Sequence, residues 1–232
     1  MDLKSAKVSV LNKVLRDNYT FIIPFIMSTS LMTVLLATVG NDRLFLDINS
    51  CHSAFADFFF LNFTNLGDGT IAFIFIVVLF WISFREALTF LSITLLITIL
   101  VTILKNVIFP GFSRPVAYFE PTAAIRLVTG YNPPVLGTFP SGHTATAFSV
   151  CFYLSILSKS QVAKFFLFVT AFLVAYSRIY LSAHFPVDVV VGAAISVSVT
   201  IVCYYFSRKI LNLKLDKKLT FNPKFLVRQQ HL

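Results

Sequence analysis

The chain has 232 residues, of which 57% are hydrophobic and 12% are charged, and its formal net charge is +9. Because a soluble domain carries about a quarter charged residues, this chain has too few charges to cover a surface that faces water. Its 27 Phe and 8 Tyr residues also exclude a disordered chain, since disordered chains are poor in aromatic residues. We therefore expect an integral membrane protein made of one domain, residues 1–232.

Six apolar segments follow one another along the chain. A helix needs about 20 mostly apolar residues to cross a bilayer, and its backbone must satisfy its own hydrogen bonds there. The segments are residues 21–39, 70–84, 87–104, 144–157, 165–181 and 187–206. The second and fourth are short, so we expect them to include flanking positions, such as residues 139–143 before the fourth. The predicted fold is all-α, a polytopic bundle of six transmembrane helices, whose first segment is a retained anchor and not a signal peptide.

The basic residues divide unevenly between the two ends of this bundle. An even number of spans places both termini on one side, which then carries fourteen bases and four acids, against five bases and six acids on the other. Because cytoplasmic loops carry the excess of Lys and Arg, both termini are predicted to be cytoplasmic. The basic tail, residues 207–232, is interpreted as a topology signal in preference to a patch for anionic lipid headgroups. Charge placed in this way predicts no nucleic-acid partner.

A group of polar residues lies at the predicted outer, periplasmic ends of the spans, where ionisable residues indicate a functional site. Each residue alone is explained by helix capping or by a long side chain that reaches the headgroups. Together they place three cations, two histidines and one carboxylate on one side of the membrane. The residues are Lys105, Arg114, Ser141, Gly142, His143, Arg178, His184 and Asp188.

This set of residue types suits a phosphate ester. Three cations neutralise a tetrahedral anion, and arginine binds two of its oxygens at once. The backbone N–H groups of Ser141, Gly142 and His143 would open a helix, and a helix N-terminus with a glycine binds anions. Asp188, four residues after His184 on a first helical turn, can hold one ring nitrogen and leave the other free to attack phosphorus. A second histidine is needed to protonate the departing oxygen and then to activate water.

The same residues resemble the three-part signature of the type 2 phosphatidic acid phosphatase superfamily, which includes membrane lipid phosphatases, glucose-6-phosphatases and vanadium haloperoxidases. The second part, Pro-Ser-Gly-His, is matched in full at residues 140–143, and the third, Ser-Arg followed by His and Asp, is matched in full at residues 177–188. The first part departs from the pattern, because eight residues separate Lys105 from Arg114 in place of the family's six. Pro110-Gly111 in this stretch is a turn signal that is expected to absorb the two extra residues.

The resemblance implies a role for each residue. His184 would be the nucleophile that forms a phosphohistidine, Asp188 would orient it, and His143 would act first as acid and then as base. The phosphoryl oxygens would be held by Lys105, Arg114, Ser141, Gly142 and Arg178. No metal and no other cofactor is expected, and the three distant cysteines offer neither a disulfide framework nor a metal-ligand spacing.

The resemblance therefore implies a metal-independent membrane lipid phosphatase with its motif core at residues 105–188 and its site at the outer face. The short chain resembles the bacterial members, which implies a bacterial inner membrane and a periplasmic site. The substrate candidates are undecaprenyl pyrophosphate, lipid A, phosphatidylglycerophosphate and phosphatidic acid, and an outward-facing site favours the first two. The aromatic stretch Tyr118-Phe119-Glu120 is expected to shape the headgroup pocket. The sequence does not indicate an oligomeric state.

Two other functions stay open. A lipid phosphotransferase would form the same phosphohistidine and pass the phosphoryl group to another lipid in place of water. A non-catalytic phospholipid-binding or transport protein would need the cations but not both histidines, so the spacing of His184 and Asp188 weighs against it. A channel is disfavoured because the ionisable residues gather at one face and do not line a path across the membrane.

Overall fold

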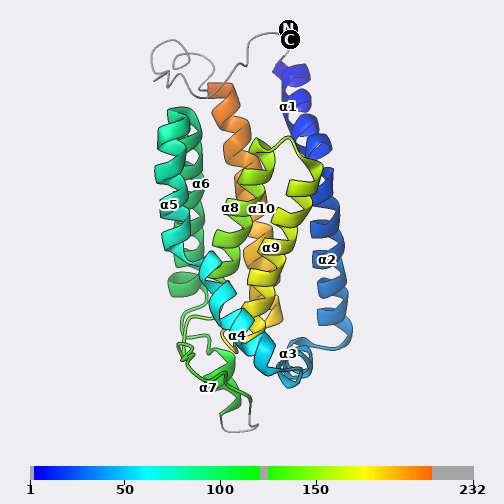
Figure 1. Ribbon diagram of the computed structural model, residues 1–232, viewed down its shortest axis with the longest axis vertical. Helices are drawn as coiled ribbons and strands as arrows, with labels where there is room; N and C mark the ends of the chain where they lie inside the picture. The colour runs from blue at the N-terminus through cyan, green and yellow to red at the C-terminus, as the bar shows by residue number, and fades with distance from the viewer. Residues whose placement is uncertain (1–2, 121–124, 211–232) are drawn as a thin grey trace.

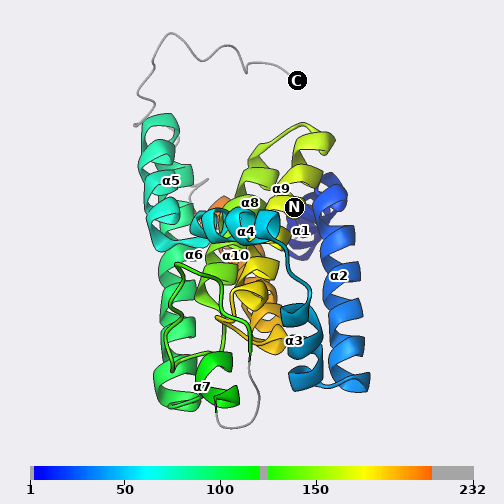
Figure 2. The ribbon, with the colours of Figure 1, turned by 60° about the horizontal axis from the view of Figure 1, so that its bottom comes forward.

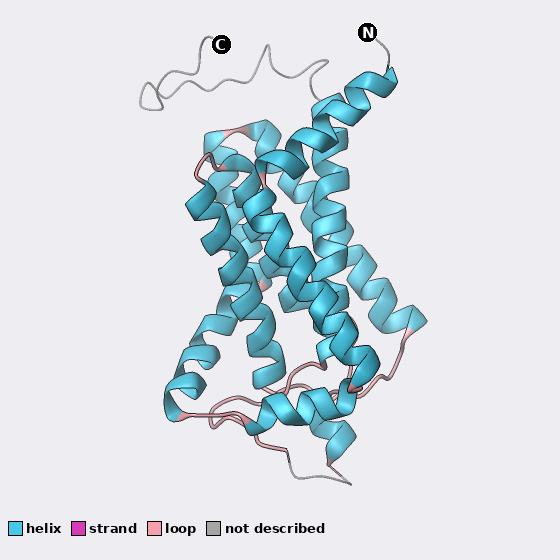
Figure 3. Cartoon of the chain, turned by 90° about the vertical axis from the view of Figure 1, so that its right-hand side faces the viewer, coloured by secondary structure: helices cyan, strands magenta, loops and turns pink. Residues whose placement is uncertain are grey.

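The computed structural model describes residues 3–120 and 125–210, and these residues form helices and loops without a strand (Figure 3). Long helices run side by side along one axis, and short helices cross one end of the bundle (Figures 1 and 2). The long helices are α2 (Tyr19–Thr38), α5 (Gly69–Ile82), α6 (Phe84–Ile103), α8 (Gly142–Leu157), α9 (Gln161–Tyr180) and α10 (Pro186–Ile210). The other elements are α1 (Leu3–Asp17), α3 (Asn41–Ser50), α4 (Ala54–Phe63), a 3-10 turn (Thr64–Gly67), a π turn (Leu104–Ile108) and α7 (Pro115–Phe119).

All six segments predicted to span the membrane are helices in the structure. Four of them, α2, α6 with its π turn, α9 and α10, are long and apolar enough to cross a membrane. Helix α5 has only 14 residues, and it qualifies as a fifth candidate when it is counted with α4 and the 3-10 turn, from which it bends by 50°. Helix α8 has 16 residues and is about 24 Å long, so by length alone it falls short of a span. The described chain thus holds four or five candidate spans.

The outer helices expose large apolar side chains over their whole length. Met27 on α2 is 67% exposed, Phe73 on α5 is 65% exposed and Trp81 on α5 is 81% exposed. A continuous apolar surface of this kind is rare on soluble monomers, and it suits contact with lipid chains. Helix α8 differs, because ten of its sixteen residues are buried against α6, α9 and α10. Its surroundings are protein and not lipid, which explains how a short helix is accommodated in the bundle.

A close approach between α10 and the start of α8 sets the geometry of one end of the bundle. A Cβ atom at Gly192 would lie 2.6 Å from the carbonyl oxygen of Ser141, so only glycine fits there. The backbone N–H of Ser141 donates to the carbonyl of Asp188 at 3.0 Å, and Ser196 Oγ donates to the carbonyl of Ala145 at 2.7 Å. The first turns of α8 and α10 are therefore fixed against each other.

The opposite end of the bundle carries a second polar cluster. Arg208 on α10 donates to both carboxylate oxygens of Glu86 at 2.7 and 2.8 Å, and the Tyr153 hydroxyl donates to Glu86 at 2.7 Å. The start of the predicted basic tail, residues 207–210, thus continues α10 and is part of the bundle, while residues 211–232 lie outside the described chain. Helix α1 and the end of α10 lie at this end, whereas α3, α4 and α7 lie at the other (Figure 1).

Candidate active site

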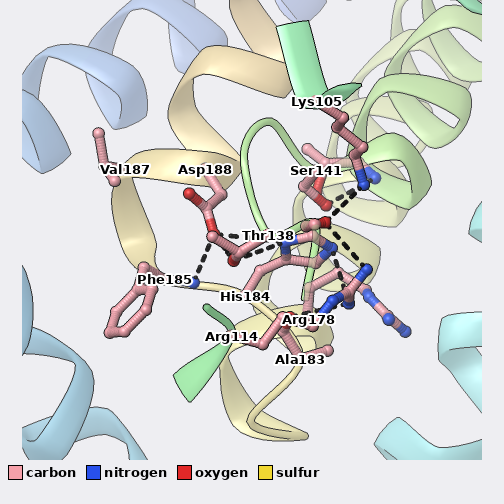
Figure 4. Close-up of polar contacts among 12 residues, drawn as sticks. Lys105, Arg114, Thr138, Ser141, Arg178, Ala183, His184, Phe185, Val187 and Asp188 are labelled. Atoms are coloured by element: carbon pink, nitrogen blue, oxygen red, sulfur yellow. Dashed lines mark hydrogen bonds and ion pairs between the residues drawn. The ribbon is translucent and has the colours of Figure 1, made fainter. Parts of the chain in front are cut away.

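The eight predicted site residues come from four different parts of the chain and meet at the α7 end of the bundle. Hydrogen bonds and electrostatic interactions connect their side chains, and Figure 4 shows the polar contacts. The π turn carries Lys105, the residue before α7 is Arg114, Ser141 caps α8, and Gly142 and His143 open it. Arg178 ends α9, His184 lies in the loop before α10, and Asp188 is in the first turn of α10.

His184 and Asp188 form a buried pair. His184 is 1% exposed, and its Nδ1 atom lies 3.3 Å from Oδ2 of Asp188. The sequence predicts a contact within one helical turn, but His184 lies two residues before α10 and only Asp188 belongs to the helix. Its other nitrogen, Nε2, lies 3.3 Å from Nη1 of Arg114, which is always a donor. Nε2 is therefore the acceptor and Nδ1 carries the proton. Burial, helped by the positive charges of Arg114 and Arg178, holds the pKa of His184 well below its ordinary value, so the ring is neutral.

Backbone carbonyl groups hold the guanidinium of Arg114. Its Nε donates to Leu136 at 3.0 Å, its Nη1 to Ala183 at 2.9 Å and its Nη2 to Gly137 at 3.3 Å. The side chain is buried, and burial lowers the pKa of Arg114 without depriving it of its charge. The loop before α8 thus fixes a cation beside His184.

Lys105 reaches the site despite its longer spacing from Arg114. Its Nζ donates at 2.9 Å to the carbonyl of Gly137, the same group that binds Arg114 (Figure 4). The intervening stretch contains the π turn and then a turn at Pro110-Gly111, where Gly111 has a φ of +79° that favours glycine. The expected turn is present, and the π turn, for which the sequence offers no periodic signal, adds a second irregularity before Arg114.

Neutral hydroxyl groups hold the third cation, Arg178. Its Nη1 donates to Thr64 Oγ1 at 2.6 Å and its Nη2 donates to the Tyr131 hydroxyl at 2.8 Å. Its Nε is buried and has no hydrogen-bond partner within residues 3–120 and 125–210. Sequence reasoning missed both Thr64 and Tyr131, because single hydroxyl residues in loops carry no spacing signal.

The cations of this site lack counter-ions. Over the described part of the chain, no carboxylate lies within ion-pair distance of Lys105, Arg114 or Arg178. Buried charges without a partner are costly, so an arrangement of this kind is suited to a bound anion. Among the same residues, no group of three or more His, Cys, Asp or Glu side chains is placed to hold a metal ion.

The start of α8 offers room for such an anion. A Cβ atom added to Gly142 would meet nothing within 4 Å, so open space lies beside the helix N-terminus. The Ser141 oxygen accepts from the Thr144 hydroxyl at 2.9 Å, which leaves the Ser141 hydroxyl proton free to donate. The backbone N–H of Ser141, which the sequence predicts to be an anion donor, is bonded instead to the carbonyl of Asp188. The N–H groups of Gly142 and His143 and the Ser141 hydroxyl are therefore the donors at this helix N-terminus.

His143 lies where the 3-10 turn meets α8. A Cβ atom at Gly67 would be 2.8 Å from the carbonyl oxygen of His143, so the turn is in direct contact with the start of the helix. Asp68, which follows Gly67, accepts hydrogen bonds from the backbone N–H and the hydroxyl of Thr70 at 2.8 and 2.6 Å. Its carboxylate also interacts electrostatically with His143. The sequence did not indicate this neighbour.

An apolar groove of about 540 Å³ runs behind the His184–Asp188 pair. Thr138 and Asp188 form part of its wall, together with a set of aromatic side chains. These are Phe109, Phe112, Tyr118, Phe139 and Phe185. Tyr118 lies in the groove as expected from the aromatic stretch, whereas Phe119 packs in the core against Phe45, with ring centroids 5.4 Å apart.

Comparison with known proteins agrees with this geometry. Residues 86–211 match the family model of the PAP2 superfamily. The chain is 30% identical over 161 residues to the lipid A 4'-phosphatase of Bacteroides thetaiotaomicron, and the aligned region covers 67% of this chain and 71% of that protein. It is 28% identical over 164 residues to the lipid A 4'-phosphatase of Porphyromonas gingivalis, with 68% of each chain covered.

Two solved structures share the fold. The crystal structure of Aquifex aeolicus LpxE matches with a TM-score of 0.62 and 35% identity, over 73% of this chain and 94% of that one. The first transmembrane PAP2-type phosphatidylglycerolphosphate phosphatase from Bacillus subtilis matches with a TM-score of 0.59 and 20% identity, over 84% and 97%. At that identity the second match shows the fold alone. From the family model, the curated phosphatases and the apolar helices together, we conclude that the chain belongs to the PAP2 superfamily and is a membrane lipid phosphatase.

Proposed function

We propose that this protein removes a phosphate group from lipid A through a phosphohistidine intermediate on His184. The observation that carries the proposal is a neutral, buried histidine beside cations that, among the described residues, are hydrogen-bonded to neutral groups and to no carboxylate. A cluster of positive charge binds the dianionic phosphate, and a neutral imidazole attacks phosphorus. Neither feature alone would support both binding and chemistry.

In the proposed reaction, Nε2 of His184 attacks phosphorus and the bond from phosphorus to the lipid oxygen breaks. Protonated His143 donates its proton to that oxygen, so that the lipid leaves as an alcohol. His143 then takes a proton from water, the water oxygen attacks the phosphohistidine, and inorganic phosphate leaves while His184 is restored. Asp188 stabilises the positive charge that the imidazole gains, because its Oδ2 atom faces Nδ1 at 3.3 Å.

Five residues would hold the phosphoryl oxygens, three by charge and two at the start of α8. A phosphate oxygen offers Lys105 and Arg114 a charged acceptor in place of the neutral carbonyl of Gly137, which makes the new bonds stronger. Arg178 would contribute its buried Nε, and Ser141 and Gly142 would donate from the N-terminus of α8. Positioning and charge of this kind are the main sources of catalysis in phosphoryl transfer.

Lipid A is preferred among the four candidate substrates because both curated relatives are lipid A 4'-phosphatases. A site at the outer face would reach a headgroup displayed on the periplasmic leaflet. Undecaprenyl pyrophosphate, phosphatidylglycerophosphate and phosphatidic acid serve as the comparison substrates.

We also infer a six-span topology within one domain, residues 1–232, with the motif core at residues 105–188. The sixth span would be α8, enclosed by its neighbours, and the bent pair α4 and α5 would count as one span. The bases Arg85, Lys159 and Arg208 lie at helix ends opposite the site, which supports cytoplasmic termini and a periplasmic site. A membrane-impermeant maleimide should label Cys51, which is exposed at the site end, in intact spheroplasts. Labelling of a Lys159→Cys variant in which Cys51 is replaced by serine, under the same conditions, would contradict this orientation.

The reaction is tested by measuring phosphate release from the four lipids by detergent-purified protein with a chelator present. We expect the fastest release from lipid A, no loss on chelation, and no release by His184→Ala. His52→Ala, which changes an exposed loop histidine, is the matched control and should keep wild-type activity. A newly phosphorylated lipid in place of free phosphate would identify a phosphotransferase. Activity in His184→Ala would exclude the phosphohistidine.

A further inference from the structure

Thr138 is a buried polar residue beside the active site that belongs to none of the three motifs. It is 4% exposed and lies two residues before Pro140. Its backbone N–H donates to the carbonyl of Phe112 at 3.3 Å, and that of the preceding Gly137 donates to the same carbonyl at 3.0 Å. The loop before α8 is thus tied to the loop before α7, and the Thr138 side chain has a fixed position.

The Thr138 hydroxyl makes two contacts, both with the His184–Asp188 pair (Figure 4). It donates to Oδ2 of Asp188, and its oxygen lies 3.4 Å from Nδ1 of His184. The same Oδ2 atom also accepts from the backbone N–H of Phe185 at 2.9 Å and faces Nδ1 at 3.3 Å. One carboxylate oxygen therefore receives three donors, and Thr138 and Phe185 hold it from two directions.

The direction of the hydroxyl bond decides the role of its oxygen. Because the hydroxyl proton points to Asp188, a lone pair of Oγ1 is available to His184. Both oxygens near Nδ1 are then acceptors, so Nδ1 must carry the proton and Nε2 must be unprotonated. At 3.3 Å the bond from Nδ1 to Asp188 alone is long for an N–H···O bond, and a second acceptor at 3.4 Å reinforces it.

Thr138 and Asp188 both line the 540 Å³ apolar groove, whose other lining is largely aromatic. A carboxylate that faces an apolar groove needs donors of its own, because an unsatisfied buried charge is costly. Among the described residues, Oδ2 would keep the Phe185 and His184 donors without the hydroxyl, so the carboxylate would be held less firmly in its position.

We propose that Thr138 is a positioning residue for catalysis, whose hydroxyl fixes the Asp188 carboxylate and, with it, the proton of His184 on Nδ1. The inference rests on the proposed function, because it concerns how His184 is prepared to attack phosphorus. Residues that orient a reacting group through a hydrogen bond typically contribute about tenfold to a hundredfold in activity.

The test compares Thr138→Val, which keeps the shape and removes the hydroxyl, with Thr138→Ser, which keeps the hydroxyl. Thr200→Val is the matched control, because Thr200 is fully buried in α10 and its hydroxyl has no partner among the described residues. We expect kcat for phosphate release to fall about tenfold to a hundredfold in Thr138→Val with KM little changed. Thr138→Ser and Thr200→Val should stay within about threefold of wild type. Thr138→Ala is measured as well, so that the loss of the hydroxyl is still tested if Thr138→Val does not fold.

A structural role alone would not change the histidine tautomer. In ¹⁵N NMR of protein labelled at histidine, the His184 ring should show one tautomer in wild type and a mixture in the variants without the hydroxyl. Thr138→Val should add little to Asp188→Asn, because the two residues act through one contact. Wild-type kcat and an unchanged tautomer in either hydroxyl-free variant would overturn the inference. Activity that survives in His184→Ala would refute the proposed function first, so the two failures are distinguishable.

Discussion

The contact between Gly192 and Ser141 yields a prediction that depends on geometry alone. A Cβ atom at residue 192 would lie 2.6 Å from the carbonyl oxygen of Ser141, whereas ordinary contacts begin at 3.4 Å. Gly192→Ala must therefore separate α10 from the start of α8 by about 0.8 Å. Asp188 lies one turn earlier on α10, and its carbonyl accepts the Ser141 N–H at 3.0 Å, so the shift moves the His184–Asp188 pair relative to the start of α8.

A displacement of about 1 Å in a catalytic site costs up to a hundredfold in rate, so we expect kcat to fall about tenfold to a hundredfold. The fold should survive. Overpacking costs about 1–3 kcal/mol, and replacing glycine by alanine within a helix returns about 1 kcal/mol. Activity is thus expected to fall much more than stability.

The assay is phosphate release from the lipid that the wild-type protein hydrolyses, with thermal unfolding in the same detergent measured in parallel. Gly69→Ala is the matched control, because this glycine opens α5 and an added Cβ would meet nothing within 4 Å. The control should keep wild-type kcat. If Gly192→Ala turned over as fast as Gly69→Ala, the reasoning from the close contact would be refuted.

Three further predictions follow from the polar groups. Arg178→Lys should lower kcat/KM, measured by steady-state kinetics, at least tenfold. A lysine cannot replace the planar guanidinium, which donates to two hydroxyl groups at once. His184 should stay neutral at pH 6, since its pKa lies well below the ordinary value, which a histidine ¹⁵N titration checks. Because the folded protein binds fewer protons than the unfolded chain, stability should fall as the pH drops below about 6.5, and less so in His184→Gln. Arg208→Met should lower the free energy of unfolding by about 2 kcal/mol, measured by chemical unfolding, and should leave kcat unchanged. The loss is limited because Arg85, at 3.5 Å, keeps Glu86 partly paired. An unchanged unfolding midpoint would show that the ion pair between Arg208 and Glu86 does not stabilise the protein.

The sequence predicts the long helices well because their signal is local. Each of the six apolar segments becomes a helix, and the two short ones, α5 and α8, are short in the structure as well. Helices α3 and α4 escape prediction because ten residues are too few for a clear apolar period and because their role is to cover the loops at one end. Whether α8 counts as a span depends on its neighbours, which no local pattern describes.

The motif residues of the site are predicted because each stands at a fixed offset from another. The Asp188 side chain in the first turn of α10 contacts His184 four residues earlier, and Ser141 caps the helix that the motif opens. Thr138 and Tyr131 are different, since each contacts a partner that lies about 50 residues away in the sequence. Such contacts arise only when the loop before α8 is placed against α9 and α10, so they require the folded structure.

The unpaired cations bear on the order in which the two products depart. In the proposed reaction Lys105, Arg114 and Arg178 would bind the phosphoryl group and not the lipid alcohol, so after hydrolysis they would contact inorganic phosphate alone. The lipid product is then expected to diffuse away first and phosphate last, and phosphate release to limit turnover. Added inorganic phosphate should accordingly compete with the substrate, and higher salt should weaken this inhibition by screening the same charges. The local phosphate concentration would in this way regulate how fast the membrane loses its lipid phosphates.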